Sequence, residues 1–266
     1  MSLAETVRRA LEEDIGTGDI TTNLCVAEDA RAVGRFIARE PIVVAGTELL
    51  QYLFDNFEIK IPRGGRAGAG DEIACIRGPA RQLLSHERVA LNFLQRLSGI
   101  ATLARRYADA VAHTKCRVLD TRKTTPGLRV LEKMAAAAGS VVNHRMGLHD
   151  AILIKNNHIT AAGGVRAALD RTKPGGLPVE IEVRTRAELD EALANGATHL
   201  LLDNLTPAEA ADWIAYIDGR ATVELSGGIT LSNVRAYAES GADFVSCGAI
   251  THSAPAVDIN LRLEPA

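Results

Sequence analysis

The chain has 266 residues, of which 47% are hydrophobic and 24% are charged, proportions that are typical of an ordinary globular protein. Its formal net charge is −3 at pH 7, so bulk charge does not predict nucleic-acid binding. Any cationic binding site must therefore be local, within a mildly acidic protein.

The cysteines and the N-terminal segment are those of a protein in a reducing compartment. Cys25, Cys75, Cys116 and Cys247 form no CxxC pair and no Cys/His spacing that suits zinc, and scattered free thiols fit the cytosol. Residues 1–14 have the pattern of a short amphipathic helix and lack the apolar stretch of a signal peptide. No run of 18 apolar residues is present, so we expect no membrane span and a cytoplasmic location.

The first 115 residues predict a separate α+β domain. Short strands are expected around 33–45 and 57–76, followed by a long helix from about 81 to 112. The tail 253–266 lacks the rhythm of the segment before it, and we expect it to pack back onto this first domain.

Residues 116–252 form the second predicted domain, in which short apolar strands alternate with helices, the pattern of a parallel sheet. The expected strands are 118–123, 151–156, 179–184, 199–204, 222–227 and 243–248, with helices at 128–138, 164–172, 187–194, 207–217 and 231–239. A doubly wound sheet fits this alternation, but a repeat of about 20 to 25 residues in the last units favours a β/α barrel. The six clear strands are fewer than the eight of a complete barrel.

Polar residues or glycines close the predicted strands at the end where β/α barrels place their active sites. These strand-end residues are Arg122 with Lys123, Lys155, Glu182, Asp203, Ser226 with Gly227, and Gly248. One of them alone would be an ordinary solvated strand end. Six successive ends of this kind, on strands with apolar interiors, predict a binding site.

The segment 120–158 concentrates positive charge. It holds six Lys or Arg and three His residues, namely Arg122, Lys123, Arg129, Lys133, Arg145, Lys155, His144, His149 and His158. Arginine offers a planar fork to carboxylates and phosphates, and lysine offers a point charge. The presence of Arg129 and Lys133 is explained equally well by a helix face exposed to solvent and by a role in the binding site. The others predict a site for polyanionic small molecules, with further anion affinity from a helix that begins at 124–127.

The remaining strand ends predict the partners of such an anion. The carboxylates of Glu182 and Asp203 suit either Mg²⁺ or the hydroxyls of a sugar. Gly227 and Gly248 lie on adjacent late strands, the usual phosphate site of a barrel, and His252 lies just beyond. A sugar phosphate with a second anionic group, and an anionic co-substrate, fit this composition.

Long motifs cover nearly the whole chain. They are LEEDIGTGDITT (11–22), HERVALNFLQRLSGIAT (86–102), DTRKTTPGLRVLEK (120–133), VNHRMGLHDAILIKNNHI (142–159), EIEV (180–183), LLDN (201–204), ELSGGI (224–229) and GAITHSAPAVDINL (248–261). These segments closely resemble the quinolinate phosphoribosyltransferase family, the carboxylating nicotinate-nucleotide pyrophosphorylases. The resemblance implies an N-terminal α+β open sandwich and an incomplete, seven-stranded α/β barrel. It also implies that quinolinate and phosphoribosyl pyrophosphate (PRPP) are converted to nicotinate mononucleotide, CO₂ and pyrophosphate with Mg²⁺, in de novo NAD biosynthesis.

For quinolinate, the resemblance implies that Arg122, His144 and Arg145 hold the two carboxylates. Lys155 is implied to contact a carboxylate or the pyrophosphate. Arg88 resembles the arginine that the family inserts into the active site of the partner subunit. A homodimer, or a higher homo-oligomer, would then be the active form.

For PRPP, the resemblance implies that Glu182 and Asp203 face the ribose and Mg²⁺, directly or through water, and that Lys123 meets carboxylate or pyrophosphate. The residues implied to bind the 5′-phosphate are Ser226, Gly227, Gly248 and His252. The implied catalytic residues are Lys123, Lys155, Glu182 and Asp203.

Three alternatives stay open at this point. A paralogue from molybdenum operons shares the DTRKTTPG block, although its likeness weakens at LIKNNH, LLDN and ELSGGI. A class I aldolase would use Lys123 or Lys155 as a Schiff-base nucleophile, which requires a desolvated lysine. A non-catalytic anion-binding protein would show no turnover.

Overall fold

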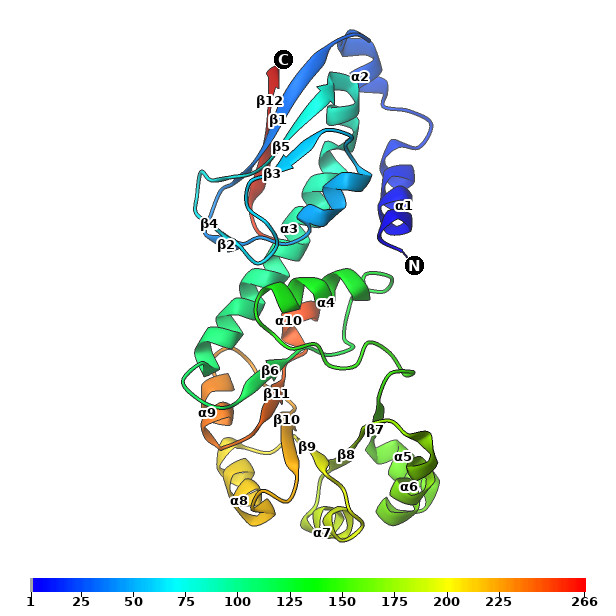
Figure 1. Cartoon of the computed structure of the whole chain (residues 1–266), viewed down its shortest axis with the longest axis vertical. Coiled ribbons are helices and arrows are strands. Elements are labelled where there is room, and N and C mark those ends of the chain that lie inside the picture. The colour runs from blue at the N-terminus through cyan, green and yellow to red at the C-terminus, as the bar shows by residue number, and fades with distance from the viewer. Residues whose placement is uncertain (1) are drawn as a thin grey trace. The chain divides into compact units, whose positions relative to one another are not determined.

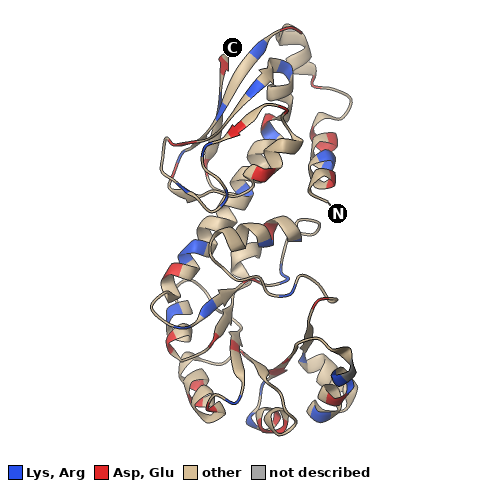
Figure 2. Cartoon of the chain, in the orientation of Figure 1, with Lys and Arg blue, Asp and Glu red and all other residues tan. Residues whose placement is uncertain are grey.

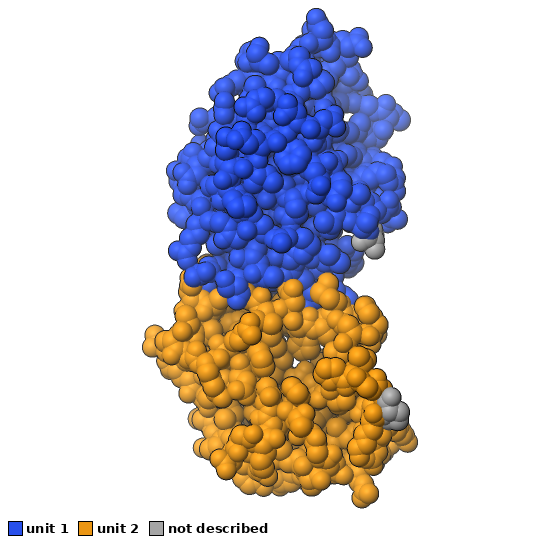
Figure 3. All heavy atoms as spheres, viewed as in Figure 1, with its two compact units in different colours: residues 1–105, 124–140, 250–266 blue, residues 106–123, 141–249 orange. Residues whose placement is uncertain are grey.

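The computed structural model describes residues 2–266, except for the side chain of Pro174. The chain divides into two compact units (Figure 3), which are described separately. The first unit contains the chain up to Arg105 together with residues 124–140 and 250–266. The second contains residues 106–123 and 141–249.

The first unit is built on a four-stranded sheet in the order β12-β1-β5-β3, all antiparallel (Figure 1). The elements that lie in it, or begin or end in it, are α1 (Leu3–Ile15), α2 (Ile20–Cys25), β1 (Arg31–Ala38), β2 (Ile42–Val43), η1 (Thr47–Tyr52), β3 (Phe57–Ile59), β4 (Arg66–Ala67), β5 (Glu72–Pro79), α3 (Ala80–Val111), α4 (Arg129–Ala138), α10 (Ala249–His252) and β12 (Ile259–Pro265). The tail supplies β12, which pairs with β1 along its length. Phe36 is fully buried on β1, opposite Leu261 and Ala74.

The division of the chain differs from the predicted boundary at residue 115, because α4 belongs to the first unit. Gly139, which ends α4, allows this packing: a Cβ at that position would lie 2.3 Å from the carbonyl oxygen of Ala101 and 2.5 Å from the Cβ of Ala104. Glu132 of α4 is also fully buried and bonded to Arg96 of α3, at 2.9 Å. The contacts of α4 with α3 therefore place α4 in the first unit, although α4 follows β6 of the second unit in the chain.

The second unit is a curved parallel sheet in the order β6-β11-β10-β9-β8-β7, and helices lie outside it (Figure 1). Its elements are β6 (Arg117–Leu119), β7 (Ile152–Ile154), α5 (Asn156–Ala162), α6 (Val165–Thr172), η2 (Lys173–Gly175), β8 (Val179–Val183), α7 (Arg186–Ala194), β9 (His199–Asp203), α8 (Pro207–Ile217), β10 (Thr222–Ser226), α9 (Val234–Glu239) and β11 (Phe244–Ser246). A single parallel bridge joins Leu119 to Val142 beside β6, where the chain runs between β6 and β7. In the second unit, the described residues therefore form a sheet of six strands and one bridge, which is an incomplete barrel.

Local sequence signals explain most of the element ends. Thr206 and Glu209 form a reciprocal capping box at the start of α8, with Pro207 as its first residue. The predicted helix start at 124–127 was wrong, since α4 begins only at Arg129. Thr125 does not cap that helix, because its hydroxyl donates to the buried carboxylate of Glu132 at 2.7 Å. No helix N-terminus therefore adds anion affinity at 124–127.

Charged residues of both signs lie on the outer helices α6 and α7 of the second unit. Figure 2 shows acidic and basic residues interspersed on α6 and α7. Across the described residues, no helix is long and apolar enough to cross a membrane.

Candidate active site

The pairing of β8, β9 and β10 places four acids on one face of the sheet. Glu182 and Glu224 are each paired with Leu201 of β9, so they lie in one row. Because side chains alternate between the two faces of a strand, Glu180 and Asp203, two residues along, point to the same face. A face with this many carboxylates in an otherwise apolar sheet predicts a polar site at the carboxyl ends of the strands.

Glu182 and Asp203 are joined by an arginine that follows β8. Arg184 Nη2 donates to Glu182 Oε1 at 2.7 Å and lies 3.8 Å from Asp203 Oδ2. Glu182 is only 5% exposed, whereas Arg184 is exposed. The structure thus brings the two predicted acids together, and it shows that they attract a cation.

The ends of β9 and β10 are linked by hydrogen bonds. Ser226 Oγ donates to Asp203 Oδ1 at 2.6 Å, and the Asn204 side-chain amide donates to Asp203 Oδ2 at 2.6 Å. Gly227 has φ of +92°, and a Cβ there would lie 2.2 Å from Asn204 Oδ1. Glycine is therefore required at 227, where the chain must pass close to Asn204.

The segment that follows β6 is fixed by a buried acid. Asp120 is fully buried and accepts the His144 backbone N–H at 2.8 Å and the Asn143 side-chain amide at 2.6 Å. Burial lowers the pKa of Arg145, and the positive charge of Arg122 lowers it further. Two guanidinium groups that repel each other in this way would both be stabilised by a bound anion, as predicted for the substrate carboxylates.

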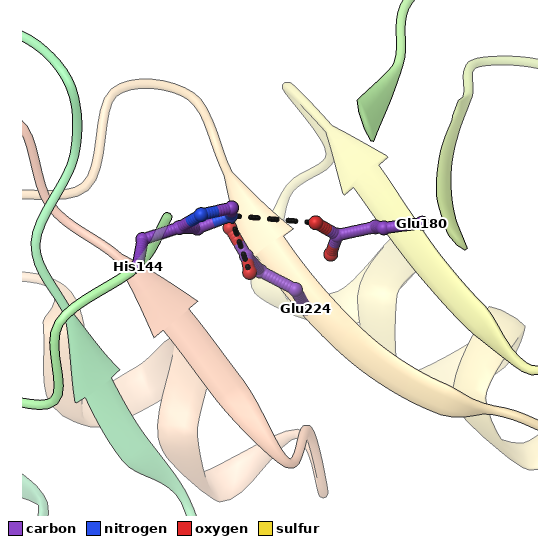
Figure 4. Close-up of side chains that lie close together, drawn as sticks. All are labelled: His144, Glu180 and Glu224. Carbon is purple, nitrogen blue, oxygen red and sulfur yellow. Dashed lines mark ion pairs between the residues drawn. The ribbon is translucent and has the colours of Figure 1, made fainter. Parts of the chain in front are cut away.

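His144 meets two acids that the sequence reasoning did not assign. Its Nε2 lies 3.3 Å from Glu180 Oε2 and 3.5 Å from Glu224 Oε2. Figure 4 shows the three side chains pointing toward one another, with the acids on β8 and β10. Burial raises the pKa of Glu224 to about 8, and the nearby charge of Glu180 adds to this effect. Glu180 precedes Glu182 by two positions on β8, and Glu224 precedes Ser226 by two positions on β10, so the cluster is on the same face as these strand-end residues.

The predicted lysines differ in their surroundings. Lys123 and Lys155 are exposed, and Lys155 immediately precedes α5. An aldolase would need one of them desolvated, so their exposure argues against that alternative. Lys133 is 1% exposed, which rules out a solvated face, one of the two interpretations left open for this residue, because α4 packs its side chain into the first unit.

The other predicted residues lie in different parts of the chain. Gly248 follows β11 and is half-buried in the second unit. Arg88, on α3, and His252, at the end of α10, belong to the first unit, and both are exposed. His252 Nδ1 lies 2.5 Å from the Ser253 hydroxyl. The role of Arg88 in a partner subunit stays a prediction.

Comparison with known proteins identifies the family. The family described as "Quinolinate phosphoribosyl transferase, C-terminal domain" matches residues 100–262, and the corresponding N-terminal domain matches residues 19–98. The chain belongs to the quinolinate phosphoribosyltransferase family. It is similar to the carboxylating nicotinate-nucleotide pyrophosphorylase of Mycobacterium leprae, with 40% identity over 273 residues that cover 97% of this chain and 96% of the relative.

Solved structures of relatives confirm the predicted fold of this family member. The crystal structure of NadC from Streptococcus pyogenes is similar, with a TM-score of 0.94 and 37% identity, and covers 99% of this chain and 97% of its own. The nicotinate-nucleotide pyrophosphorylase from Ehrlichia chaffeensis has a TM-score of 0.94 and 35% identity, over 99% of both chains. An incomplete barrel with an N-terminal α+β domain is thus the architecture of the chain.

The sequence reasoning missed Glu180, Glu224 and Arg184 of the transferase. Glu180 and Glu224 lie inside the EIEV and ELSGGI motifs, but only the residues near the strand ends were assigned roles. A charged residue in the interior of an apolar strand was the available signal, because a buried carboxylate needs a partner. Arg184 carried no such signal, since it resembles an ordinary exposed arginine.

Proposed function

We propose that this chain transfers the phosphoribosyl group of PRPP to quinolinate with loss of CO₂, giving nicotinate mononucleotide and pyrophosphate. Membership of the family supports this reaction. The observation that carries it in the structure is that Arg145 is partly buried near Arg122, so that burial and the positive charge of Arg122 both lower the pKa of Arg145. A pyridine dicarboxylate supplies two carboxylates for these two guanidinium groups.

The reaction needs positioning and charge stabilisation rather than a covalent enzyme intermediate. The pyridine nitrogen forms a bond to the ribose C1 as the bond from C1 to pyrophosphate breaks. The nitrogen then carries positive charge, which stabilises the electron pair left on the adjacent carbon when CO₂ departs, and a proton replaces the lost carboxylate. Lys123 and Lys155, both exposed and cationic, are proposed to neutralise carboxylate or pyrophosphate charge.

The ribose and its phosphate are proposed to bind at the carboxyl ends of β8, β9 and β10, beside Glu182, Asp203 and Ser226. Carboxylates accept hydrogen bonds from ribose hydroxyls, and the Gly227 turn allows close approach of a 5′-phosphate, with Gly248 and His252 as further contacts.

Mg²⁺ is the proposed metal, and Glu182 and Asp203 the residues that would hold it, directly or through water. Their oxygens are of the hard type that Mg²⁺ prefers, and both already attract the guanidinium of Arg184, so the donor set fits a cation. When bound, Mg²⁺ would offset negative charge on the departing pyrophosphate.

We further propose that the active form is a homodimer or larger homo-oligomer in which Arg88 serves the partner's site, and that the protein works in the cytoplasm. The exposure of Arg88 on α3 and the four free cysteines are compatible with these proposals. Mixing inactive Arg88→Ala and Arg122→Ala proteins should restore part of the activity, because one mixed site then has both arginines. No recovery in mixtures shown to exchange subunits would refute sharing of Arg88.

The direct test incubates the purified chain with quinolinate, PRPP and Mg²⁺ and follows nicotinate mononucleotide. Arg122→Ala should raise the KM for quinolinate about 10- to 100-fold, the size of a lost charge-assisted hydrogen bond. Arg220→Ala, on the exposed surface next to α8, is the matched control and should leave the KM unchanged. The absence of Mg²⁺-dependent product from the folded wild type would refute the proposed function.

A further inference from the structure

His144 is engaged at both nitrogens of its ring. Nδ1 accepts the backbone N–H of Arg145 at 2.7 Å. A nitrogen that accepts a hydrogen bond carries a lone pair there, so the proton of the neutral ring must lie on Nε2. Nε2 is the atom that faces Glu180 and Glu224, and the carboxylates are acceptors for that proton (Figure 4).

The three side chains are buried enough for this arrangement to be specific. Their exposed fractions are 16% for His144, 17% for Glu180 and 6% for Glu224. Burying two neighbouring carboxylates costs free energy unless donors satisfy them. At these strand positions an apolar residue would be the ordinary choice, so the two acids call for a reason beyond packing.

Proximity to the proposed substrate site supplies that reason. His144 is the residue before Arg145, and the same face of the sheet carries Glu182 one layer above Glu180. A histidine at this place can adopt two tautomers and two ring orientations. Partners that fix the tautomer of a metal-binding histidine are worth about 10- to 100-fold in metal affinity or activity, which sets the scale expected here.

We propose that Glu180 and Glu224 are positioning residues, which hold the Nε2–H edge of His144 and thereby fix its tautomer and ring orientation for quinolinate binding. The effect on quinolinate rests on the proposed function, whereas the tautomer of His144 does not.

The first test measures the ring directly. In full-length protein with ¹⁵N-labelled histidine, assigned by comparison with His144→Asn, the ring of His144 should show a proton on Nε2 and none on Nδ1. Replacing both acids, in Glu180→Leu/Glu224→Leu, leaves the Arg145 N–H bond to Nδ1 but removes the acceptors that face Nε2, so a second population with the proton on Nδ1 should appear. A proton on Nδ1 in the wild type, or an unchanged pattern in the folded double variant, would overturn the proposal.

The second test separates positioning from a general structural role. Glu224→Leu should raise the KM for quinolinate about 10-fold and leave the KM for PRPP roughly unchanged. Glu224→Gln keeps an oxygen acceptor and should recover most of the loss, while Glu209→Gln, at the start of α8, is the matched control. A rise of both KM values together, or of neither, would overturn the proposal.

Two further outcomes are distinguishable. If the wild type shows no turnover with quinolinate and PRPP while the ring of His144 has the expected tautomer, the proposed function fails and the positioning of His144 stands. The ligand atoms of the three residues all lie within 4.8 Å of one another, a spacing that would also suit a metal ion. Loss of the Nε2 proton on adding one equivalent of Zn²⁺ would assign them to a metal and overturn the proposal.

Discussion

Replacing Glu224 by glutamine should make the second unit more stable at high pH and change little at low pH. Burial and the charge of Glu180 raise the pKa of Glu224 from 4.5 to about 8. A carboxyl group with a raised pKa contributes stability that is fully present below pH 4.5 and is lost as the pH rises through about 8. Glutamine resembles the protonated acid and does not ionise, so Glu224→Gln escapes this loss.

The size of the effect follows from the pKa of Glu224. A change from 4.5 to about 8, at about 1.4 kcal/mol for each pH unit, sets a ceiling of about 5 kcal/mol. We therefore expect the variant to gain between about 2 and 5 kcal/mol over the wild type between pH 5 and pH 9.

Urea unfolding followed by tryptophan fluorescence measures this difference, because Trp213 is the single tryptophan and lies on α8 of the second unit. Glu209→Gln is the control. Hydrogen bonds from the backbone and side chain of Thr206 lower the pKa of Glu209. The stability that Glu209 contributes is therefore present above pH 4.5 and is lost only as the pH falls through the lowered pKa of the folded state. A difference between Glu224→Gln and the wild type that stays constant from pH 5 to pH 9 would refute the reasoning.

Three further predictions concern the turn after β10, the first unit and the metal. Gly227→Ala should lower stability by about 1 to 3 kcal/mol and raise the KM for PRPP, because the added Cβ would lie 2.2 Å from Asn204 Oδ1. The control is Gly196→Ala, where φ is also positive but no atom lies within 4 Å of the added Cβ. In thermal unfolding this control should show only the smaller cost of the backbone conformation. Glu132→Ala should destabilise the first unit by about 2 to 4 kcal/mol, since it removes the buried carboxylate that accepts from Arg96 and Thr125 and leaves Arg96 only backbone carbonyl acceptors, and an unchanged melting temperature would contradict this. EDTA should abolish turnover and Mg²⁺ should restore it, so full activity in EDTA would refute the metal requirement.

The sequence predicted those features of the fold that depend on residues close together in the chain. Strand and helix positions in the second unit were close to those observed because apolar strands, capping residues such as Thr206 and terminal glycines act within a few residues. The first strand of that unit is an exception: β6 ends at Leu119 rather than 123. Beyond it the chain turns, and the Lys123 N–H donates to the Thr121 hydroxyl at 3.0 Å.

Partnerships between distant segments could not be predicted from local pattern. The approach of Arg184 to Asp203 depends on the pairing of β8 with β9. The contact of His144 with Glu180 and Glu224 depends on the register of the neighbouring strands and on the loop that carries His144. Hydrophobic periodicity fixes which face a residue occupies but not which partner it finds. The family resemblance implied that His144 binds the substrate. Only the structure shows that Glu180 and Glu224 contact His144.

The proposed reaction is tested most directly by the stoichiometry of its two leaving groups, CO₂ and pyrophosphate. Quinolinate labelled with ¹³C in the carboxylate next to the ring nitrogen is incubated with PRPP, Mg²⁺ and the wild-type chain, and labelled CO₂ and pyrophosphate are measured against nicotinate mononucleotide. The account predicts equal amounts of all three, none of which forms without PRPP. Pyrophosphate without labelled CO₂, or no product from quinolinate, would contradict it.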